Sequence, residues 1–308
     1  MTDAVVSHGH ATIKQGSKSF ALASRIFDDE MRADASMLYA WCRYCDDVVD
    51  GQIMGHGQIA DYRDGQRERL QDLIEKTDAA LKGEPTDDPV FAGLARVFQR
   101  HEIPHRHAFE LLDGFRMDAD ERTYLTTDEI LEYCYHVAGV VGVMMAYVMG
   151  VRDAKTLDRA SDLGLAFQLT NIARDVIDDA RADRVYVPSS YLRDANAPTS
   201  ASLLAKEENW PAAHIAACDL LALAEQYYQS AHVGVKELPF RCAWAILAAL
   251  KVYREIGETL RSRGFNAWQQ RVSAPSYKKL WLAATAVAPA VNRKNVPVTD
   301  RQDLFARP

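Results

Sequence analysis

The chain has 308 residues and 48% of them are hydrophobic, which is enough for a large core in one or two domains. The formal net charge is −7 with 26% charged residues, and this acidic balance argues against a nucleic-acid partner, which needs a basic surface. Five scattered cysteines do not form the disulfide framework of a small secreted protein. The N-terminal residues show no secretory signal, and we expect a cytoplasmic protein.

Helical periodicity dominates the chain. Apolar residues recur at helical spacing in residues 31–49 and 215–231, while alternating β-branched runs are nearly absent. Clusters of Pro, Gly, Asn and Asp interrupt the pattern at residues 83–89, near Pro104, at residues 194–200 and near Gly264. No low-complexity linker divides the chain. We therefore predict one all-α domain over residues 1–308, with a poorly ordered tail at about residues 292–308.

The first strongly periodic helix ends in an acidic cluster, DDVVD at residues 46–50. Asp46 and Asp50 are four residues apart and share a helix face, with Asp47 beside them. Like charges at this spacing destabilise a helix by about 0.2–0.5 kcal/mol per pair. Such a face gains stability when a cation binds to it.

The most apolar stretch, residues 137–151, contains glycines and is shorter than the roughly 20 residues that span a bilayer. A second apolar run begins at Leu280 and is interrupted by Pro289. We predict that the first stretch is a buried helix and that neither run is a membrane anchor.

A second acidic cluster repeats the spacing of the first. Asp175 and Asp179 are four residues apart, Asp178 lies between them, and Asn171 lies one turn earlier. One such face alone would be read as a solvated helix surface, but two matched clusters on helices with apolar sides favour a site for a hard divalent cation. Magnesium combines a few carboxylates with phosphate oxygens, so a diphosphate is the natural further ligand.

Arginines alternate with these aspartates. They are Arg43, Arg174, Arg181 and Arg184. Arginine forks bind phosphate oxygens well, and the same side chains could instead form salt bridges with the neighbouring aspartates. The sequence leaves both interpretations open.

Two long segments resemble the squalene and phytoene synthase family, most closely its bacterial phytoene synthases. They are YCYHVAGVVGVMMAYV at residues 133–148 and LGLAFQLTNIARDVIDDARADRVYVP at residues 163–188. The resemblance extends from about Ser17 to the region of Lys279. It implies a single isoprenoid synthase domain, with helices around a central apolar cavity and two aspartate-rich metal helices.

The resemblance also implies a role for individual residues. The metal ligands would be Asp46, Asp47, Asp50, Asn171, Asp175 and Asp179. The catalytic set would be Tyr39, Arg43, Asp46, Asp50, Asp175, Asp179 and Tyr253. The substrate contacts would be Ser17, Lys18, Ser19, Phe20, Tyr133, Ala138, Val141, Gly142, Gln168, Asn171, Arg174, Arg184 and Arg271. The family has basic residues near the last position, but RVSAPSYKK at residues 271–279 departs from its usual spacing.

The implied reaction is the head-to-head condensation of two geranylgeranyl diphosphates, through a cyclopropylcarbinyl diphosphate, to phytoene and diphosphate. The cofactor would be Mg²⁺, for which Mn²⁺ can substitute, and no NADPH is expected because no dinucleotide fingerprint is visible. The alternatives are a dehydrosqualene or squalene synthase using farnesyl diphosphate, a chain-elongating prenyl transferase or cyclase, and, remotely, a non-catalytic scaffold. Because these substrates are lipids, we expect transient contact with membrane surfaces.

Overall fold

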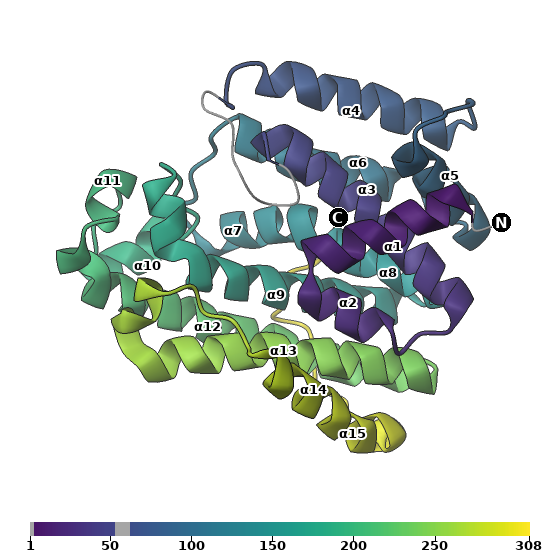
Figure 1. Cartoon of the computed structure of the whole chain (residues 1–308). Helices are drawn as coiled ribbons and strands as arrows, with labels where there is room; N and C mark the ends of the chain where they lie inside the picture. The colour runs from purple at the N-terminus through teal and green to yellow at the C-terminus, as the bar shows by residue number, and fades with distance from the viewer. Residues whose placement is uncertain (1–2, 53–61) are drawn as a thin grey trace.

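The protein is described by a computed structural model over residues 3–52 and 62–308, apart from the side chains of Lys18 and Ser19. Within these residues the regular structure is entirely helical, which confirms the predicted all-α class (Figure 1). The α-helices are α1 (Ala4–Gly16), α2 (Lys18–Ser24), α3 (Asp29–Asp50), α4 (Gln66–Leu81), α5 (Pro89–His101), α6 (Arg106–Ala119), α7 (Thr127–Cys134), α8 (Val140–Val148), α9 (Ala154–Arg181), α10 (Ser189–Asp194), α11 (Ala201–Leu204), α12 (Trp210–Gly234), α13 (Phe240–Arg263), α14 (Ser276–Thr285) and α15 (Val287–Val291). Shorter helical segments are η1 (Tyr135–Gly139), η2 (Glu207–Asn209), η3 (Val235–Glu237), η4 (Gly264–Gln269) and η5 (Arg293–Asn295).

Helix α3 carries the first acidic cluster and has clear sequence signals at both ends. The side chain of Asp28 accepts a hydrogen bond from the Met31 N–H at 2.9 Å and caps its first turn. Gly51 follows the last turn in the left-handed conformation, with φ of 60°. The helix therefore ends directly after Asp50.

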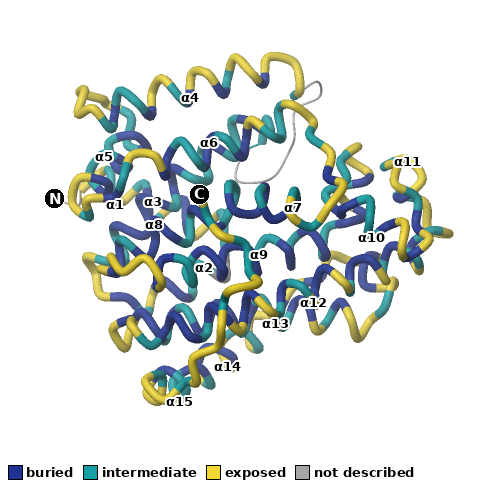
Figure 2. The backbone as a smooth tube through the Cα atoms, turned by 180° about the vertical axis from the view of Figure 1, so that it is seen from behind, coloured by how far each residue is buried: buried dark blue, intermediate teal, exposed yellow. Residues whose placement is uncertain are grey.

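Helix α9 is 28 residues long, begins after the capping side chain of Asp153, and carries the second acidic cluster. It lies in the centre of the fold, where α8, α12 and α13 pack against it (Figure 1). Figure 2 shows that the buried part of the backbone follows α8, α9 and α12, while α4 alternates between exposed residues on its outer side and buried residues on its inner side. The second acidic cluster is thus held on a central helix that other helices pack against.

The apolar stretch of the sequence forms part of a nearly continuous helix made of α7, η1 and α8, in which η1 is a single π-helical turn. By length and composition alone, Thr127–Val148 could cross a membrane. In the fold, however, Tyr135, Val140, Val143 and Met144 are completely buried against other helices. This helix is part of the protein core, as predicted.

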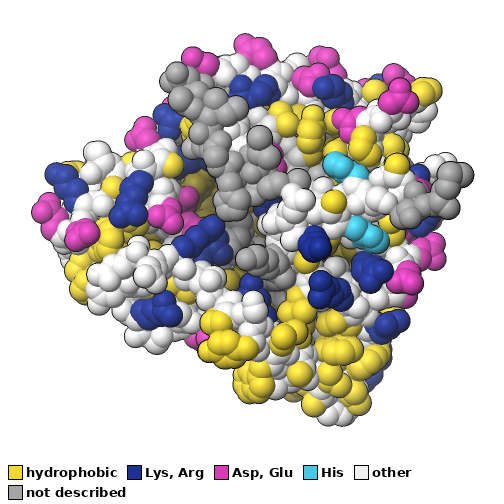
Figure 3. Space-filling view, viewed as in Figure 1, with side chains coloured by type: hydrophobic (Ala, Val, Ile, Leu, Met, Phe, Trp, Pro, Cys, Tyr) yellow, Lys and Arg dark blue, Asp and Glu magenta, His cyan; other side chains and the backbone are white. Residues whose placement is uncertain are grey.

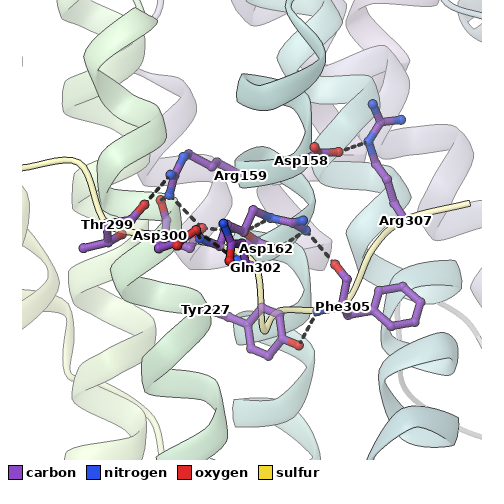
Figure 4. A network of polar contacts seen from close by, with 11 residues as sticks. Asp158, Arg159, Asp162, Tyr227, Thr299, Asp300, Gln302, Phe305 and Arg307 are labelled. Carbon is purple, nitrogen blue, oxygen red and sulfur yellow. Dashed lines mark hydrogen bonds and ion pairs between the residues drawn. The ribbon is translucent and has the colours of Figure 1, made fainter.

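Residues 292–308, which the sequence predicts to be a poorly ordered tail, contact α9. Their last part lies along α9, where Arg301 pairs with the buried Asp162 and Arg307 pairs with Asp158 (Figure 4). Local composition could not show this docking, because the aspartate partners are 139 and 149 residues away in the chain.

Candidate active site

A cavity of about 940 Å³ runs through the protein between α2, α3, η1, α8, α9 and α13. The polarity of the residues that line the cavity changes along its length. Carboxylates of Asp46, Asp50, Asp175 and Asp179 lie among the lining residues at one end. The remainder is mainly apolar and includes small and aliphatic side chains from η1, α8 and the first half of α9. The cavity therefore combines a charged end with an apolar tunnel.

Helix α3 presents its functional side chains to the cavity in one line. Tyr39, Arg43, Asp46 and Asp50 follow one another at helical spacing and all line the cavity. The opposite face carries apolar side chains, including the completely buried Trp41 and Cys45. Burial of this apolar face fixes the rotation of the helix and so aims both aspartates into the cavity.

Arginine partners neutralise the first acidic cluster. Nη1 of Arg43 lies 2.6 Å from Oδ2 of Asp46, and Nη2 of Arg184 lies 2.9 Å from Oδ1 of Asp50. Asp47 lies 3.9 Å from Arg43 and is not among the residues that line the cavity. Arg184 is likewise behind the cavity wall, so its contact with the site runs through Asp50.

The second cluster is arranged on α9 in the same way. Gln168, Asn171, Asp175 and Asp179 share the face that lines the cavity. Asp175 accepts hydrogen bonds from its neighbour Arg174. Asp178 also lines the cavity, but its side chain is half exposed and lies 3.4 Å from Arg181.

Arg271 joins this cluster from the far end of the chain. Its Nη2 lies 3.0 Å from Oδ2 of Asp175 and its Nε lies 3.2 Å from Oδ1 of the same side chain. It lines the cavity together with Lys279. Lys278 instead pairs with Glu255 and is not among the lining residues of this cavity.

Burial and neighbouring charges shift the pKa values of the acidic side chains in this site. Burial raises the pKa of Asp46 to about 7, opposed by Arg43 and assisted by the charge of Asp50. Burial and the charge of Asp175 raise the pKa of Asp179 well above its ordinary value. The pKa of Asp175 is lowered, because the hydrogen bonds from Arg174 and Arg271 outweigh the opposing effect of burial.

The donor set fits a hard divalent cation. The two clusters offer only oxygen ligands, and among the described residues the buried Oδ1 of Asn171 has no hydrogen-bond partner. With their arginine partners in place, no three His, Cys, Asp or Glu side chains in the described ranges are grouped closely enough to hold a metal ion. A cation would favour the ionised forms of Asp46 and Asp179, whose pKa values are raised first by burial and then by neighbouring carboxylates.

Asp118 on α6 is a residue of this site that the sequence did not indicate. It lines the cavity and accepts hydrogen bonds from the hydroxyl groups of Tyr133, at 3.1 Å, and Tyr186, at 2.8 Å. Burial raises its pKa to about 6, opposed by the nearby Arg184. A weak signal exists, because Leu111, Phe115 and Asp118 follow at helical spacing and all line the cavity.

Aromatic side chains form part of the tunnel wall. The rings of Phe20 and Tyr39 are stacked with centroids 5.5 Å apart, and those of Phe167 and Tyr253 with centroids 4.0 Å apart. Phe167 was not predicted from the sequence.

The other predicted wall residues also reach the cavity, and they are Tyr133, Ala138, Val141 and Gly142. Ser17, which was predicted to contact a diphosphate, lines the cavity as well. The hydroxyl of Ser17 additionally caps α2 by accepting a hydrogen bond from the Phe20 N–H at 3.2 Å. The side chains of Lys18 and Ser19 lie outside the described residues.

The sequence of this chain matches those of known proteins over most of its length. Residues 13–278 match the family model described as squalene/phytoene synthase. The chain belongs to the squalene/phytoene synthase family. It is 46% identical to a phytoene synthase of Pseudescherichia vulneris, over 99% of this chain and 98% of the relative. It is 47% identical to a 15-cis-phytoene synthase of Paracoccus sp. (strain N81106 / MBIC 01143), over 100% and 99%.

Solved structures of the family share the fold. The crystal structure of a dehydrosqualene synthase in complex with ligand superposes with a TM-score of 0.82 at 26% identity, covering 94% of this chain and 97% of that one. Squalene synthase HpnC from Alicyclobacillus acidocaldarius gives a TM-score of 0.67 at 21% identity, covering 85% and 95%. These similarities confirm the predicted isoprenoid synthase fold. Members of this family are prenyl transferases that depend on a divalent metal.

Proposed function

We propose that this protein joins two molecules of geranylgeranyl diphosphate head to head to form phytoene, with release of two diphosphates. The observation that carries this proposal is the 46–47% identity, over nearly the whole chain, to proteins named phytoene synthases. The cavity supports it, because a charged end and a long apolar tunnel suit a substrate with a diphosphate head and a prenyl chain.

The reaction requires one end of the site to hold an anion and the other to enclose a carbocation. Arg43, Arg174 and Arg271 are placed to bind diphosphate oxygens as each allylic carbon–oxygen bond breaks. The first ionisation releases one diphosphate, and coupling to the second molecule gives a cyclopropylcarbinyl diphosphate and a proton. The second ionisation releases the other diphosphate and is followed by rearrangement and loss of a proton from carbon.

The aromatic walls protect the cation during these steps. Tyr39 and Tyr253 face the cavity, and burial raises the pKa of both hydroxyl groups, so both side chains remain neutral near pH 7. Neutral aromatic faces stabilise a nearby cation without reacting with it. The apolar tunnel also excludes water, which would otherwise convert the carbocation to an alcohol.

We assign the metal as Mg²⁺, with Mn²⁺ able to substitute, and the ligands as Asp46, Asp50, Asn171, Asp175 and Asp179. These residues line one end of the cavity and offer oxygen donors only. The bound cation supplies positive charge to the diphosphate. NADPH is not part of this proposal.

The decisive test is product analysis by mass spectrometry with purified protein, Mg²⁺, one prenyl diphosphate and no NADPH. We expect phytoene from geranylgeranyl diphosphate and a lower rate with farnesyl diphosphate. A faster reaction with farnesyl diphosphate would favour a dehydrosqualene synthase. A hydrocarbon that forms only with added NADPH would favour a squalene synthase, and no Mg²⁺-dependent release of diphosphate would contradict prenyl transfer.

We further propose that this protein is cytoplasmic and binds transiently to anionic membranes through α14 and α15. Tyr277, Leu280, Trp281 and Val291 on these helices are 74%, 58%, 61% and 60% exposed. Figure 3 shows hydrophobic side chains gathered on this part of the surface. Exposed Trp, Tyr and Leu side chains on a helix are typical of proteins that insert into the membrane interface.

The charge of this segment supports an anionic lipid partner. Residues 271–299 contain five basic residues and no Asp or Glu, although the whole chain has a net charge of −7. The same segment contributes Arg271 and Lys279 to the cavity lining, so membrane contact would bring the cavity close to its lipid substrates.

Vesicle flotation tests this contact. We expect binding to anionic but not to neutral vesicles, and loss of binding in the double variant Leu280→Ser, Trp281→Ser. Leu203→Ser on α11 is the control, because Leu203 is also exposed, at 44%, on another element. Unchanged vesicle binding by the double variant would refute the assignment. A wild-type protein that forms oligomers in solution, together with a double variant that does not, would also refute it and would identify the patch as a protein interface.

A further inference from the structure

The C-terminal segment passes beside α9 and α12 and is tied to both by polar contacts (Figure 4). At the centre of this network of contacts is Asp162, whose side chain is completely buried. Arg301 donates two hydrogen bonds to Asp162, from Nε and from Nη2, both of 2.8 Å, and Ser230 on α12 donates a third of 2.5 Å. A two-pronged contact of this kind is strong and fixes the geometry of both partners.

Arg159 connects this network to the reaction cavity. Its Nη2 donates a hydrogen bond of 2.8 Å to the main-chain oxygen of Thr299, and its Nη1 contacts Ser230. Arg159 is also one of the residues that line the cavity. Gly234 on α12 leaves room for its aliphatic stem, since a Cβ atom on Gly234 would lie 2.9 Å from Cβ of Arg159.

Further contacts hold the end of the segment in place. Nε of Arg307 lies 2.5 Å from Oδ1 of Asp158. The hydroxyl of Tyr227 accepts a hydrogen bond of 3.2 Å from the Phe305 N–H, and the Phe305 ring lies 6.1 Å from that of Tyr135 in η1. The segment therefore connects α9, α12 and η1, all of which contribute to the tunnel wall.

The position of this network along α9 places it far from the diphosphate end. Arg159 precedes Asp175 by 16 residues, which corresponds to about 24 Å along a helix axis. Around Arg159 the lining is formed by Thr156, Leu163, Val235 and Leu238. This is the region that the far end of a long prenyl chain would reach.

We propose that residues 299–307 form a strap that holds the wall of the prenyl tunnel at its deep end from outside the cavity, with Arg301 as a positioning residue that acts through Asp162 and Arg159. The strap determines the longest chain that fits and keeps water out of that end. The exclusion of water during the reaction rests on the proposed function, whereas the limit on chain length is a property of the cavity itself.

The buried charge of Asp162 explains why docking is required. Without Arg301, its carboxylate would be buried with one hydroxyl partner and the partial influence of Arg159, an arrangement that is strongly unfavourable. Loss of the strap would also remove the Thr299 carbonyl from Arg159. Both changes would loosen the wall at the closed end of the tunnel.

The test compares Arg301→Met with the double variant Arg301→Met, Asp162→Asn, which avoids an unpaired buried charge, and with Arg301→Lys, which restores a positive charge. The control is Arg67→Met, because Arg67 forms a surface pair with Asp120 and does not line the tunnel. The probes are saturated alkyl diphosphates of increasing length. They cannot lose diphosphate to form an allylic carbocation, and their binding is measured by calorimetry. Inorganic pyrophosphate measures the charged end separately.

We expect both Met variants to shift their length preference by about tenfold toward chains longer than a geranylgeranyl group, with unchanged pyrophosphate affinity and partial recovery in Arg301→Lys. In turnover, the same variants should release a larger share of prenyl alcohol. Unchanged chain-length preference in the folded double variant would overturn the proposal, even with a lower melting temperature. Because alkyl probes do not react, this result is independent of whether the wild type forms phytoene.

Discussion

Gly142 on α8 lies directly against the main-chain oxygen of Ala160 on α9, with no room for a side chain between them. The same relationship recurs nearby, where a Cβ atom on Gly164 of α9 would overlap with the main-chain oxygen of Ala138. Two glycines, one on each helix, thus allow the backbones to touch. The helix that forms the tunnel wall and the helix that carries the second acidic cluster are held at a fixed separation.

Because of this contact, a substitution at Gly142 tests the packing of α8 against α9 rather than the depth of the tunnel. Gly142→Ala should push α8 away from α9, because the obstructing atom belongs to the backbone and cannot rotate aside. We expect a loss of about 1–3 kcal/mol in the free energy of unfolding, and equal losses of activity on long and short substrates. Denaturant unfolding with both kcat/KM values checks this, and a variant as stable as the wild type would contradict the close contact.

Val141 is the better position for testing tunnel depth. It is partly exposed to the cavity, so Val141→Phe should narrow the tunnel without separating the helices. Because overpacking affects the longer chain first, we expect the ratio of kcat/KM for geranylgeranyl over farnesyl diphosphate to fall by about tenfold.

Val140 provides the matched control for this experiment. It is completely buried and is not among the lining residues of the cavity, so Val140→Phe should disturb the core and reduce both reactions alike. Equal effects on the two substrates in Val141→Phe would mean that Val141 is ordinary core.

The sequence predicted those parts of the site that a single helix encodes. Asp46 and Asp50, like Asp175 and Asp179, share a face through their spacing alone, and apolar residues on the opposite face orient each helix. The contact of Arg43 with Asp46 is also local, at three residues apart, although the sequence could not choose between an ion pair and a phosphate contact.

Features that depend on distant parts of the chain were not predictable. Asp118 is one of three acidic residues on α6, and no second acid lies three or four positions before it. Its role follows from hydrogen bonds with Tyr133 and Tyr186, which tertiary packing brings to it. Arg301 belongs to a polar segment with low helical periodicity, and its significance depends on a buried aspartate 139 residues away. Pairings of this kind are decided by packing rather than by local pattern.

The metal assignment predicts different outcomes for two neighbouring aspartates. Asp175→Asn should nearly abolish turnover while circular dichroism remains unchanged, because Asp175 lies among the proposed ligands and its replacement removes no apolar contact. Asp178→Asn should reduce turnover much less, since Asp178 is half exposed and pairs with Arg181. Near-normal turnover of Asp175→Asn would remove that residue from the metal site.

The metal-free protein should become less stable as the pH rises. The pKa of Asp46 is about 7 and that of Asp118 about 6, both raised chiefly by burial above the ordinary value near 4. Between about pH 4 and 7 these two side chains therefore bind more protons in the folded protein than in the unfolded chain, so their contribution to the free energy of unfolding falls as pH increases. In EDTA, we expect a higher melting temperature at pH 5.5 than at pH 8.

Mg²⁺ should reverse this loss at the upper end of the range. The cation binds ionised carboxylates that only the folded protein brings together, so it should raise the melting temperature more at pH 8 than at pH 5.5. Asp46→Asn supplies the control, because it removes one raised carboxylate and should flatten the pH dependence in EDTA while weakening the response to Mg²⁺. If the variant and the wild type show the same pH slope and the same Mg²⁺ response, Asp46 neither titrates in this range nor binds the cation.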